Sequence, residues 1–337
     1  MPFTDVSQDP AALRRIFTGL GLAQDDEVVR AVALPGGVSS GIFRIDLHSG
    51  SYCLKQALPR LKVSKVWEVP VERVFAEIRW LRTAGAIAPG HVPRVIGEDD
   101  EAKCFVMEFL GNDYRNWKAD LLGGSVDMAL APQMGDVLGR IHAATADDAR
   151  IAAAFATDAN FHAIRLEPYL VESARVNPAL APRLHALVDT TAGTRRVLVH
   201  GDVSPKNILV GPRGPVLLDA ECAWYGDPAF DLAFCLNHFL LKSVHLPAVA
   251  QALLGCFDAM QGAYMQHVRW EDARALQLRT AALLPGLALA RVDGKSPVEY
   301  LDEASRARVK DAAIALLLEP ARDLGTLAHH WGETALA

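Results

Sequence analysis

The chain has 337 residues, 51% of them hydrophobic and 22% charged, with a formal net charge of -6. This composition supplies a core and excludes a disordered chain, and its acidic balance argues against nucleic-acid binding, which needs a basic surface. The sequence has no run of 18 apolar residues, no N-terminal leader pattern and no C-x-x-C pair among its five cysteines. We therefore expect a soluble cytoplasmic protein of two domains, without nucleic-acid or membrane partners, and the oligomeric state stays open.

The first part of the chain is predicted to form a small antiparallel sheet crossed by one helix. Residues 9–22 have the pattern of a short amphipathic helix closed by glycine, and residues 27–57 that of three strands joined by turns. Residues 69–85 carry apolar side chains at helical spacing, and residues 91–110 read as two more strands around a charged turn.

The rest of the chain is predicted to be mainly helical. Helices are expected over 129–145 and 178–191, and several more follow residue 227, while short strands are expected around 198–211 and 214–221. The fold class is thus α+β and bilobal, with a small N-lobe over residues 1–110 and a larger C-lobe over residues 111–337.

One short stretch, LVHGDVSPKNILVG at 198–211, concentrates polar residues between two strand-like runs. It contains the pattern H-G-D-x-x-x-x-N, and Asp219 follows twelve residues after its asparagine. Phosphoryl transfer needs one carboxylate to orient the attacking hydroxyl and oxygen ligands to hold Mg²⁺, and Asp202, Asn207 and Asp219 supply that set. The alternative is an ordinary turn in which such residues serve as caps, but the whole set at this spacing favours the catalytic interpretation.

The motifs HGDVSPKN and LLDAE resemble those of the aminoglycoside phosphotransferase and choline kinase family, which has a protein-kinase-like fold. The resemblance implies that Asp202 is the catalytic base and that Asn207 and Asp219 bind Mg²⁺. It also implies that His200 supports the loop and that Asp231, in YGDPAFDLA, braces the loop without taking part in the chemistry.

A kinase also needs groups that hold ATP, and the first lobe offers candidates. A glycine-bearing turn at 34–45 could cradle phosphates with the backbone of Gly36, Gly37, Ser39 and Ser40, although such a turn is more often a simple hairpin. Lys55 on the following strand is placed to contact the phosphates and needs a carboxylate on the helix that follows.

Two glutamates on that helix could pair with the lysine, and only one can face it. Glu72 and Glu77 are about 140° apart around a helix. The family's Arg-x-x-x-Glu pattern favours Glu77. The run CFVMEFLG at 104–111 resembles the segment that joins the lobes, so the backbone of Glu108 to Leu110 is expected to bind the purine, with ATP preferred and GTP left open.

The acceptor is the least determined part of the prediction. DAECAWYGDPAFD resembles a branch of the family, the methylthioribose kinases, but HGDVSPKN is the ordinary family form. The side chains predicted to line the acceptor site are Glu221, Trp224, Tyr225, Arg291 and Asp293. For Glu221 a role beside the metal is equally open, and the turn that holds Arg291 and Asp293 has the composition of an ordinary polar turn.

The sequence therefore predicts an ATP- and Mg²⁺-dependent enzyme that phosphorylates a hydroxyl of a small soluble metabolite, such as a sugar, an amino alcohol or an aminoglycoside-like compound. The alternative is a nucleotide-binding regulatory module of the same fold that has lost catalysis, which the complete catalytic set disfavours. A protein substrate is disfavoured because Asp219 runs almost directly into YGDPAFD, which leaves no room for an activation segment.

Overall fold

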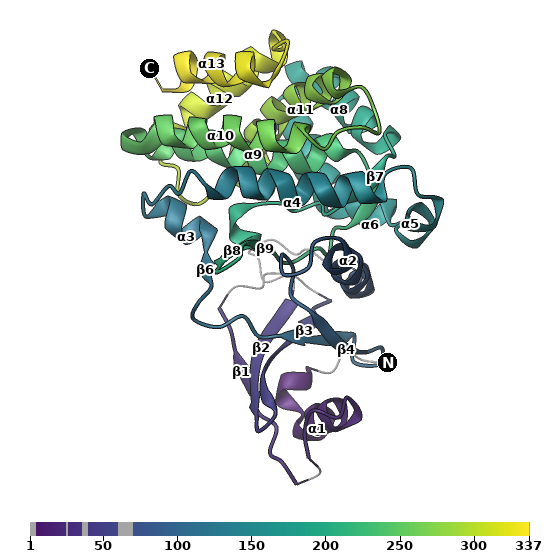
Figure 1. The fold of residues 1–337 in the computed structure, drawn as a ribbon. Helices are drawn as coiled ribbons and strands as arrows, with labels where there is room; N and C mark the ends of the chain where they lie inside the picture. The colour runs from purple at the N-terminus through teal and green to yellow at the C-terminus, as the bar shows by residue number, and fades with distance from the viewer. Residues whose placement is uncertain (1–4, 25, 36–39, 60–69, 337) are drawn as a thin grey trace. The chain divides into compact units, whose positions relative to one another are not determined.

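A computed structural model shows two compact units, Met1–Tyr114 and Arg115–Ala337 (Figure 1). The chain passes from one to the other a few residues beyond the boundary predicted from the sequence. The structure describes residues 5–24, 26–35, 40–59 and 70–336.

Unit 1 is built on an antiparallel sheet of five strands in the order β1-β2-β3-β5-β4 (Figure 1). The strands are β1 (Ala31–Ala33), β2 (Ser40–Leu47), β3 (Gly50–Ala57), β4 (Val95–Asp99) and β5 (Cys104–Glu108). In the β2–β3–β5 register Lys55 lies opposite Ile42 on one side and Phe105 on the other. Lys55 is therefore on a central strand of the sheet. The five-stranded sheet itself confirms the small antiparallel sheet that the sequence predicts.

Helices pack on this sheet and complete the core of unit 1. They are η1 (Val6–Gln8), α1 (Pro10–Gly19) and α2 (Arg73–Ile87). The Asp9 carboxylate caps α1 by accepting from the N–H groups of Ala11 and Ala12, and Pro10 occupies the first helical position, where its missing N–H costs nothing. Phe17 of α1 is fully buried in a cluster with Leu54 and Val106 of the sheet.

Unit 2 is mainly helical, as predicted, and contains two small sheets. Its helices are α3 (Trp117–Leu122), α4 (Leu130–Thr145), α5 (Ala149–Ala154), α6 (Asp158–Phe161), η2 (His162–Val171), α7 (Glu172–Val176), η3 (Pro178–Leu180), α8 (Ala181–Gly193), η4 (Pro205–Asn207), α9 (Pro228–His245), η5 (Pro247–Val249), α10 (Ala250–Met265), α11 (Ala273–Asp293), α12 (Glu303–Leu318) and α13 (Leu324–Ala335). Its strands are β6 (Arg115–Asn116), β7 (Val197–Val199), β8 (Ile208–Gly211), β9 (Gly214–Leu217) and β10 (Trp224–Gly226), with β6-β8-β9 in one sheet and β10-β7 in the other.

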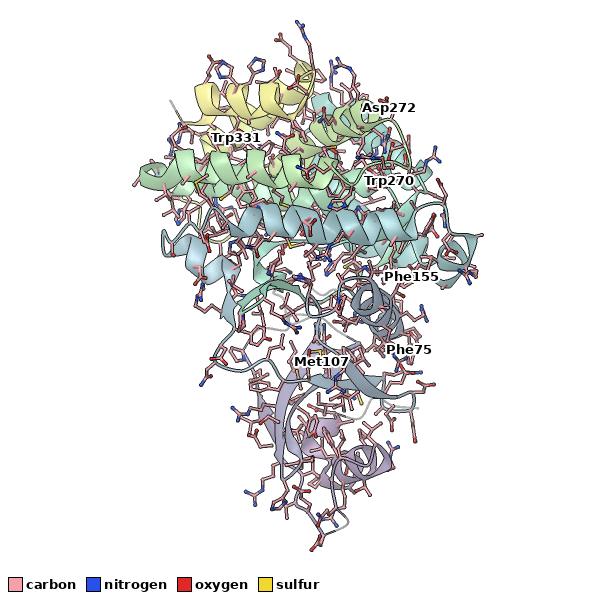
Figure 2. All side chains as sticks on the ribbon, viewed as in Figure 1. Phe75, Met107, Phe155, Trp270, Asp272 and Trp331 are labelled. Carbon is pink, nitrogen blue, oxygen red and sulfur yellow. The ribbon has the colours of Figure 1, made fainter. Side chains whose placement is uncertain are left out.

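Helix α9 is the centre of unit 2. It is buried from Pro228 to Val244, and it packs against α10 and α11 (Figure 1). A helix that is apolar on all sides has to lie inside a protein, and the polar residues that α9 carries are therefore buried as well. Further helices close the core, and Trp331 of α13, labelled in Figure 2, is fully buried. Within the described residues, the structure contains no helix that is both long and apolar enough to cross a membrane.

Helices α4 and α10 approach each other closely because small residues face the contact. A Cβ atom on Gly135 of α4 would lie 2.3 Å from the carbonyl oxygen of Met260 in α10. One turn further along α4, a Cβ atom on Gly139 would lie 2.6 Å from the ring of His267. Glycine in a helix costs about 1 kcal/mol relative to alanine, so the close approach offsets a loss of helix propensity.

We expect Gly135→Ala to lower the free energy of unfolding by about 1–3 kcal/mol, because the new methyl group meets a backbone atom that cannot rotate away. The matched control is Gly262→Ala in α10, where nothing lies within 4 Å of the added Cβ atom. There alanine should raise the free energy of unfolding by up to about 1 kcal/mol. Urea unfolding of both variants checks this, and a neutral or stabilising Gly135→Ala would show that the two helices can move apart freely.

Candidate active site

The H-G-D-x-x-x-x-N motif forms the loop between β7 and β8. Strand β7 pairs with β10 and strand β8 pairs with β9, so both ends of the loop are held by strands. Gly201 has φ +80, and a Cβ atom there would lie 2.7 Å from the carbonyl oxygen of Cys222. Glycine is therefore required for the backbone conformation and for the space, and this turn sets the direction in which the next residue, Asp202, leaves the chain.

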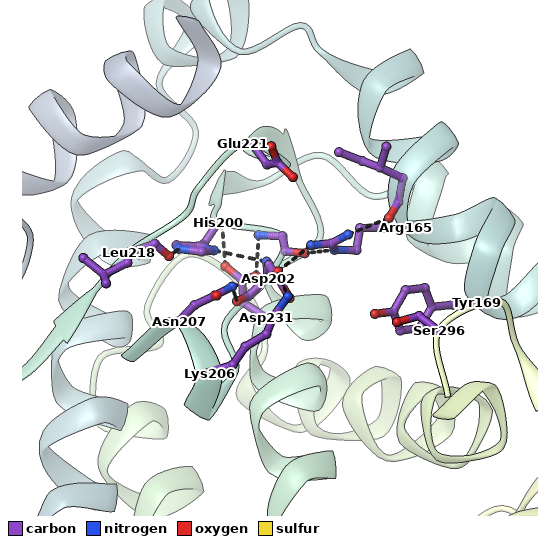
Figure 3. Close-up of polar contacts among 12 residues, drawn as sticks. Arg165, Tyr169, His200, Asp202, Lys206, Asn207, Leu218, Glu221, Asp231 and Ser296 are labelled. Carbon is purple, nitrogen blue, oxygen red and sulfur yellow. Dashed lines mark hydrogen bonds and ion pairs between the residues drawn. The ribbon is translucent and has the colours of Figure 1, made fainter. Parts of the chain in front are cut away.

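Asp231, in the first turn of α9, holds the loop through its backbone. Its Oδ2 atom accepts a hydrogen bond from the N–H of His200 at 2.7 Å, and its Oδ1 atom accepts one from the N–H of Gly201 at 2.8 Å (Figure 3). The ring of His142, which also contacts the hydroxyl of Tyr264 at 2.8 Å, lies 3.3 Å from Oδ2. Asp231 is fully buried, so this carboxylate is a rigid acceptor for two consecutive N–H groups of the loop.

His200 connects the loop to the segment that carries Asp219. The N–H of Asp202 donates to Nδ1 of His200 at 3.1 Å, so Nδ1 carries no proton. The proton is on Nε2, which donates to the carbonyl of Leu218 at 3.1 Å (Figure 3). Burial lowers the pKa of His200 and keeps the ring neutral, as this hydrogen-bond pattern requires.

The Asp202 carboxylate is 2% exposed, and its two oxygens have different surroundings. Oδ2 accepts a hydrogen bond from Nδ2 of Asn207 at 2.8 Å and forms ion pairs with Arg165 at 2.7 Å and Lys206 at 3.1 Å (Figure 3). Oδ1 accepts no hydrogen bond from any residue that the structure describes. One oxygen is thus fixed by the protein and the other is left for a further donor.

The charges around Asp202 favour its ionised form. Burial by itself would raise the pKa of Asp202, but Arg165 and Lys206 more than offset this effect, so the pKa lies below its ordinary value. Burial likewise opposes the charge of Arg165, and the Asp202 carboxylate outweighs it and raises the pKa of the guanidinium. Asp202 is therefore a carboxylate at neutral pH.

Arg165 comes from a helix that sequence reasoning did not single out. It lies in η2, a π-helix that contains Pro168. Pro168 has no N–H to donate within this helix, and in the turn before it the carbonyl of Ile164 accepts a hydrogen bond from Nη1 of Arg165 at 2.6 Å. Nε of Arg165 donates to the carbonyl of Gly201 at 2.6 Å, so the guanidinium bridges η2 and the loop. The proline within a helical stretch was the one signal in the sequence that this segment is irregular.

Asn207 and Asp219, the predicted metal ligands, lie at the two ends of the β8–β9 hairpin. The amide nitrogen of Asn207 is engaged by Asp202, so its oxygen remains as an acceptor. The N–H of Leu218 donates to the carbonyl of Asn207 at 2.8 Å, which ties the two segments together. Asp219 has φ +66, a left-handed conformation that costs about 1 kcal/mol or more outside glycine and that is found at functional sites.

In unit 1, Nζ of Lys55 lies 2.8 Å from Oε1 of Glu77, and the two side chains are 3% and 2% exposed. Glu72 is exposed at the start of α2, so Glu77, the glutamate favoured by the sequence pattern, is the one that pairs with Lys55. A buried ion pair of this kind holds the ammonium group in one position.

The other predicted nucleotide contacts are placed only in part. Gly36, Gly37 and Ser39 lie outside the described residues, while Ser40 is buried at the start of β2 opposite Ala57. At the end of β5 the N–H of Glu108 donates to the carbonyl of Arg94. A contact of Glu108 with a purine therefore falls to its carbonyl group, and Leu110 follows in an irregular segment.

The predicted acceptor residues separate into two groups. Trp224 stacks on Phe161 with ring centroids 4.3 Å apart, and the hydroxyl of Tyr225 donates to the carbonyl of Arg196. Asp293 accepts from Asn177 and pairs with Lys310. These contacts support structural roles for Trp224, Tyr225 and Asp293.

Arg291 and Glu221 remain near the charged groups of the loop. Arg291 contacts the hydroxyl of Tyr169, a residue that lies one turn after Arg165 in η2. Glu221 is 9% exposed and is one of the acids that raise the pKa of Arg165.

We expect Asp231→Asn to lower the free energy of unfolding by about 3 kcal/mol, because the amide group would face an N–H donor of the loop with its own NH₂ group. Asp258→Asn, an exposed acid on α10, is the control and should change stability by less than about 0.5 kcal/mol. Urea unfolding measures both, and equal stability of the two variants would contradict the bracing role of Asp231.

Comparisons with known proteins agree with this architecture. The model of a family described as the phosphotransferase enzyme family matches residues 30–263. Similar curated proteins include methylthioribose kinases of Pectobacterium atrosepticum and Yersinia pestis, each 27% identical over 82% of this chain and over 74% and 72% of their own length.

Solved structures with a similar fold include two small-molecule kinases. An ethanolamine kinase of Plasmodium vivax matches with a TM-score of 0.55 and 12% identity over 92% of this chain and 89% of its own. The amicoumacin kinase hAmiN, in complex with AMP-PNP, Ca²⁺ and Ami, matches with a TM-score of 0.54 and 16% identity over 96% and 94%. The predicted protein-kinase-like fold is confirmed, and the chain belongs to the phosphotransferase enzyme family.

Proposed function

We propose that this protein transfers the γ-phosphate of ATP, with Mg²⁺, to a hydroxyl group of a small soluble metabolite. The observation that carries the proposal is the asymmetry of the Asp202 carboxylate, which the protein holds through Oδ2 and leaves without a hydrogen bond at Oδ1. The names of the curated relatives, which are methylthioribose kinases, support the same class of reaction.

In this proposal Asp202 orients the acceptor. The acceptor hydroxyl donates a hydrogen bond to Oδ1, which directs an oxygen lone pair at the γ-phosphoryl group. Oδ1 takes the proton as the new O–P bond forms and the bond from the γ-phosphorus to the bridging oxygen breaks, with ADP as the leaving group. The low pKa of Asp202 makes it a weak base, and that is sufficient because phosphoryl transfer passes through a loose transition state in which the hydroxyl loses its proton late. Asp202 therefore acts mainly by aligning the acceptor hydroxyl. Its three partners at Oδ2 hold the carboxylate in the fixed position that this alignment needs.

The residues present fit a divalent ion bound together with a nucleotide. Asn207 has its nitrogen turned to Asp202, and its oxygen and the Asp219 carboxylate are hard ligands of the kind that Mg²⁺ prefers. Among the described residues there is no group of three or more His, Cys, Asp or Glu side chains that could hold an ion by themselves. This matches an ion held by one or two protein groups plus phosphate oxygens, where it would neutralise charge on the phosphates.

Lys55 and Glu77 would serve the nucleotide in unit 1. The buried ion pair fixes the ammonium group, which would contact phosphate oxygens of ATP in the way that the resemblance implies. The amicoumacin kinase structure holds AMP-PNP and Ca²⁺, and this supports a nucleotide triphosphate and a divalent ion as the ligands of the shared fold. A regulatory module without catalysis is the weaker candidate, because it would have no need of an aligned carboxylate such as Asp202.

We expect Asp202→Asn to lower kcat by about 1,000-fold or more and to leave ATP binding within a few fold of the unmodified protein, because the amide cannot take the proton. The assay is Mg²⁺-dependent ADP release with a panel of methylthioribose and other sugars, choline, ethanolamine, homoserine and aminoglycosides. Asp189→Asn, an exposed acid on α8, is the matched control and should keep full turnover. Turnover of Asp202→Asn within tenfold of the unmodified protein would end the assignment of Asp202 as the base.

Removal of divalent ions should abolish turnover, and added Mg²⁺ should restore it, because the phosphate charge is otherwise not neutralised. Asp219→Asn should raise the Mg²⁺ concentration for half-maximal turnover by about tenfold or more, since an amide is a weaker ligand than a carboxylate. A chelator titration followed by Mg²⁺ addition measures both effects. Full activity in excess chelator would contradict the metal assignment and leave the role of Asp202 to be judged separately.

A further inference from the structure

Helix α9 continues from the catalytic loop into a second polar region of unit 2. Its first turn carries Asp231, and Phe234, His238 and Lys242 follow at intervals of four residues, so these three share one face of the helix. Each interval is about 6 Å along the helix axis. The face therefore begins at Phe234, beside the loop, and ends at Lys242. The distance between its two ends is about the length of a small metabolite.

Aromatic rings connect this face to Asp202. The guanidinium of Arg165, the ion-pair partner of Asp202, lies 5.9 Å from the centre of the Phe234 ring. The ring of Tyr169 lies 5.5 Å from that of Phe234 and carries the guanidinium of Arg291 at 5.7 Å. Figure 3 shows Tyr169 and Ser296 close together near Arg165. The chain of contacts from Asp202 to Arg291 is thus continuous within unit 2.

Two cations in this region have no carboxylate partner among the described residues. Lys242 is 1% exposed, its ammonium group has no hydrogen bond or ion pair there, and its Nζ atom lies 5.1 Å from the centre of the Tyr300 ring. Nη1 of Arg291 donates to Tyr169 and Ser296, which are neutral. The nearby acid Glu299 is paired with another cation, Lys118. A buried charge without a counter-ion is costly, so this arrangement calls for an anion.

Other polar atoms of the region are also buried without a partner. They are Nδ1 of His238, Nε of Arg291 and the hydroxyl of Tyr300. His238 is 7% exposed, so bulk solvent has little access to its side chain. All three atoms can donate a hydrogen bond, and together with Lys242 they match the several lone pairs of an oxyanion.

The titration behaviour of the region agrees with an excess of positive charge. Burial, followed by the charges of Lys118 and Arg291, lowers the pKa of Lys242 to about 7, against a smaller opposite effect of Cys235 and Glu299. Burial, followed by the charges of Lys242 and Arg291, holds the pKa of His238 well below its ordinary value. A bound anion would reverse this effect at Lys242 and draw a proton onto its amine.

We propose that His238, Lys242 and Arg291 form an oxyanion subsite and that the acceptor is an anionic hydroxy compound, with its carboxylate or phosphate in this subsite and its hydroxyl at Asp202. The inference rests on the proposed function, since it assigns one end of the acceptor to Asp202. It places a polycationic aminoglycoside or a cationic amino alcohol among the disfavoured acceptors, because the subsite repels positive charge.

The test uses acceptors of one carbon skeleton that differ in charge: ribose, ribonate and ribose 5-phosphate, with methylthioribose as a second neutral compound and choline as a cation. Turnover with ATP and Mg²⁺ should be highest for an anionic member, and the comparison of ribonate with ribose 5-phosphate tells which oxyanion fits. Turnover confined to neutral or cationic members would overturn the oxyanion subsite and leave the kinase assignment intact.

Lys242→Met removes the charge and keeps most of the side-chain volume. It should raise KM for the anionic acceptor by about 10- to 100-fold, with kcat changed far less, since a charge-assisted contact distant from the reacting atoms is lost. The melting temperature should stay the same or rise, because an unpaired buried charge is removed. The control is Lys310→Met, which breaks the ion pair with Asp293. A lower melting temperature in Lys242→Met with unchanged KM would make Lys242 a structural residue and overturn the proposal.

With ribonate, KM should rise as the pH is raised above about 7, because Lys242 then has to gain a proton on binding, and the rise should be absent in Lys242→Met. If no compound is phosphorylated, calorimetric titration of ribonate and ribose 5-phosphate into the nucleotide-free protein decides the matter. Tighter binding to the unmodified protein than to Lys242→Met would support the subsite while the kinase assignment fails. No binding, or equal binding to both proteins, would overturn it.

Discussion

A single buried carboxylate, that of Asp231, accepts hydrogen bonds from two consecutive backbone N–H groups, and the position of the loop between β7 and β8 depends on it. Because these donors belong to His200 and Gly201, the next residue, Asp202, leaves the loop in a fixed direction. The carboxylate is rigid in turn because α9, which carries it, is buried along almost its whole length. The site is thus attached to the most buried helix of unit 2, and this attachment explains why a short polar loop can hold several charged side chains in fixed positions.

The charge distribution of the loop follows from this placement. The fold buries Asp202, and a buried carboxylate stays ionised only if cations lie next to it. Two cations accompany Asp202: Arg165, which belongs to η2, and Lys206, which belongs to the loop itself. Further along α9 the balance is reversed, since Lys242, together with Arg291 of α11, has no carboxylate partner within the described part of the chain. In the proposed function the two halves of the region would therefore select opposite features of an acceptor, a hydroxyl at one end and a negative charge at the other.

The sequence predicted those parts of the site that depend on spacing along one segment. Asp202, Asn207 and Asp219 were predicted because they belong to two linked motifs. Helix geometry allowed only one of Glu72 and Glu77 to face Lys55, and the resemblance to the family's Arg-x-x-x-Glu pattern favoured Glu77, which pairs with the lysine. Arg165 was missed because its position depends on a π-helix and on a fold that brings η2 to the loop, neither of which has a periodic signal. Trp224 follows the motif closely in sequence, yet β10 pairs with β7 and turns its ring onto Phe161. Proximity along the chain thus predicted the loop that holds Asp202, whereas the surroundings of the predicted acceptor residues depend on contacts between segments distant in the sequence.

The π-helix that carries Arg165 also has a consequence for related sequences. A π-helix has a wider turn than an α-helix, so a deletion of one residue near Pro168 would let the segment rewind toward an α-helix and would change the direction in which the side chains inside it point. The guanidinium would then leave Asp202, although every motif residue stayed in place. Length conservation across this segment, more than identity at the motif, would therefore mark the members of the family in which an arginine pairs with the aspartate of the loop.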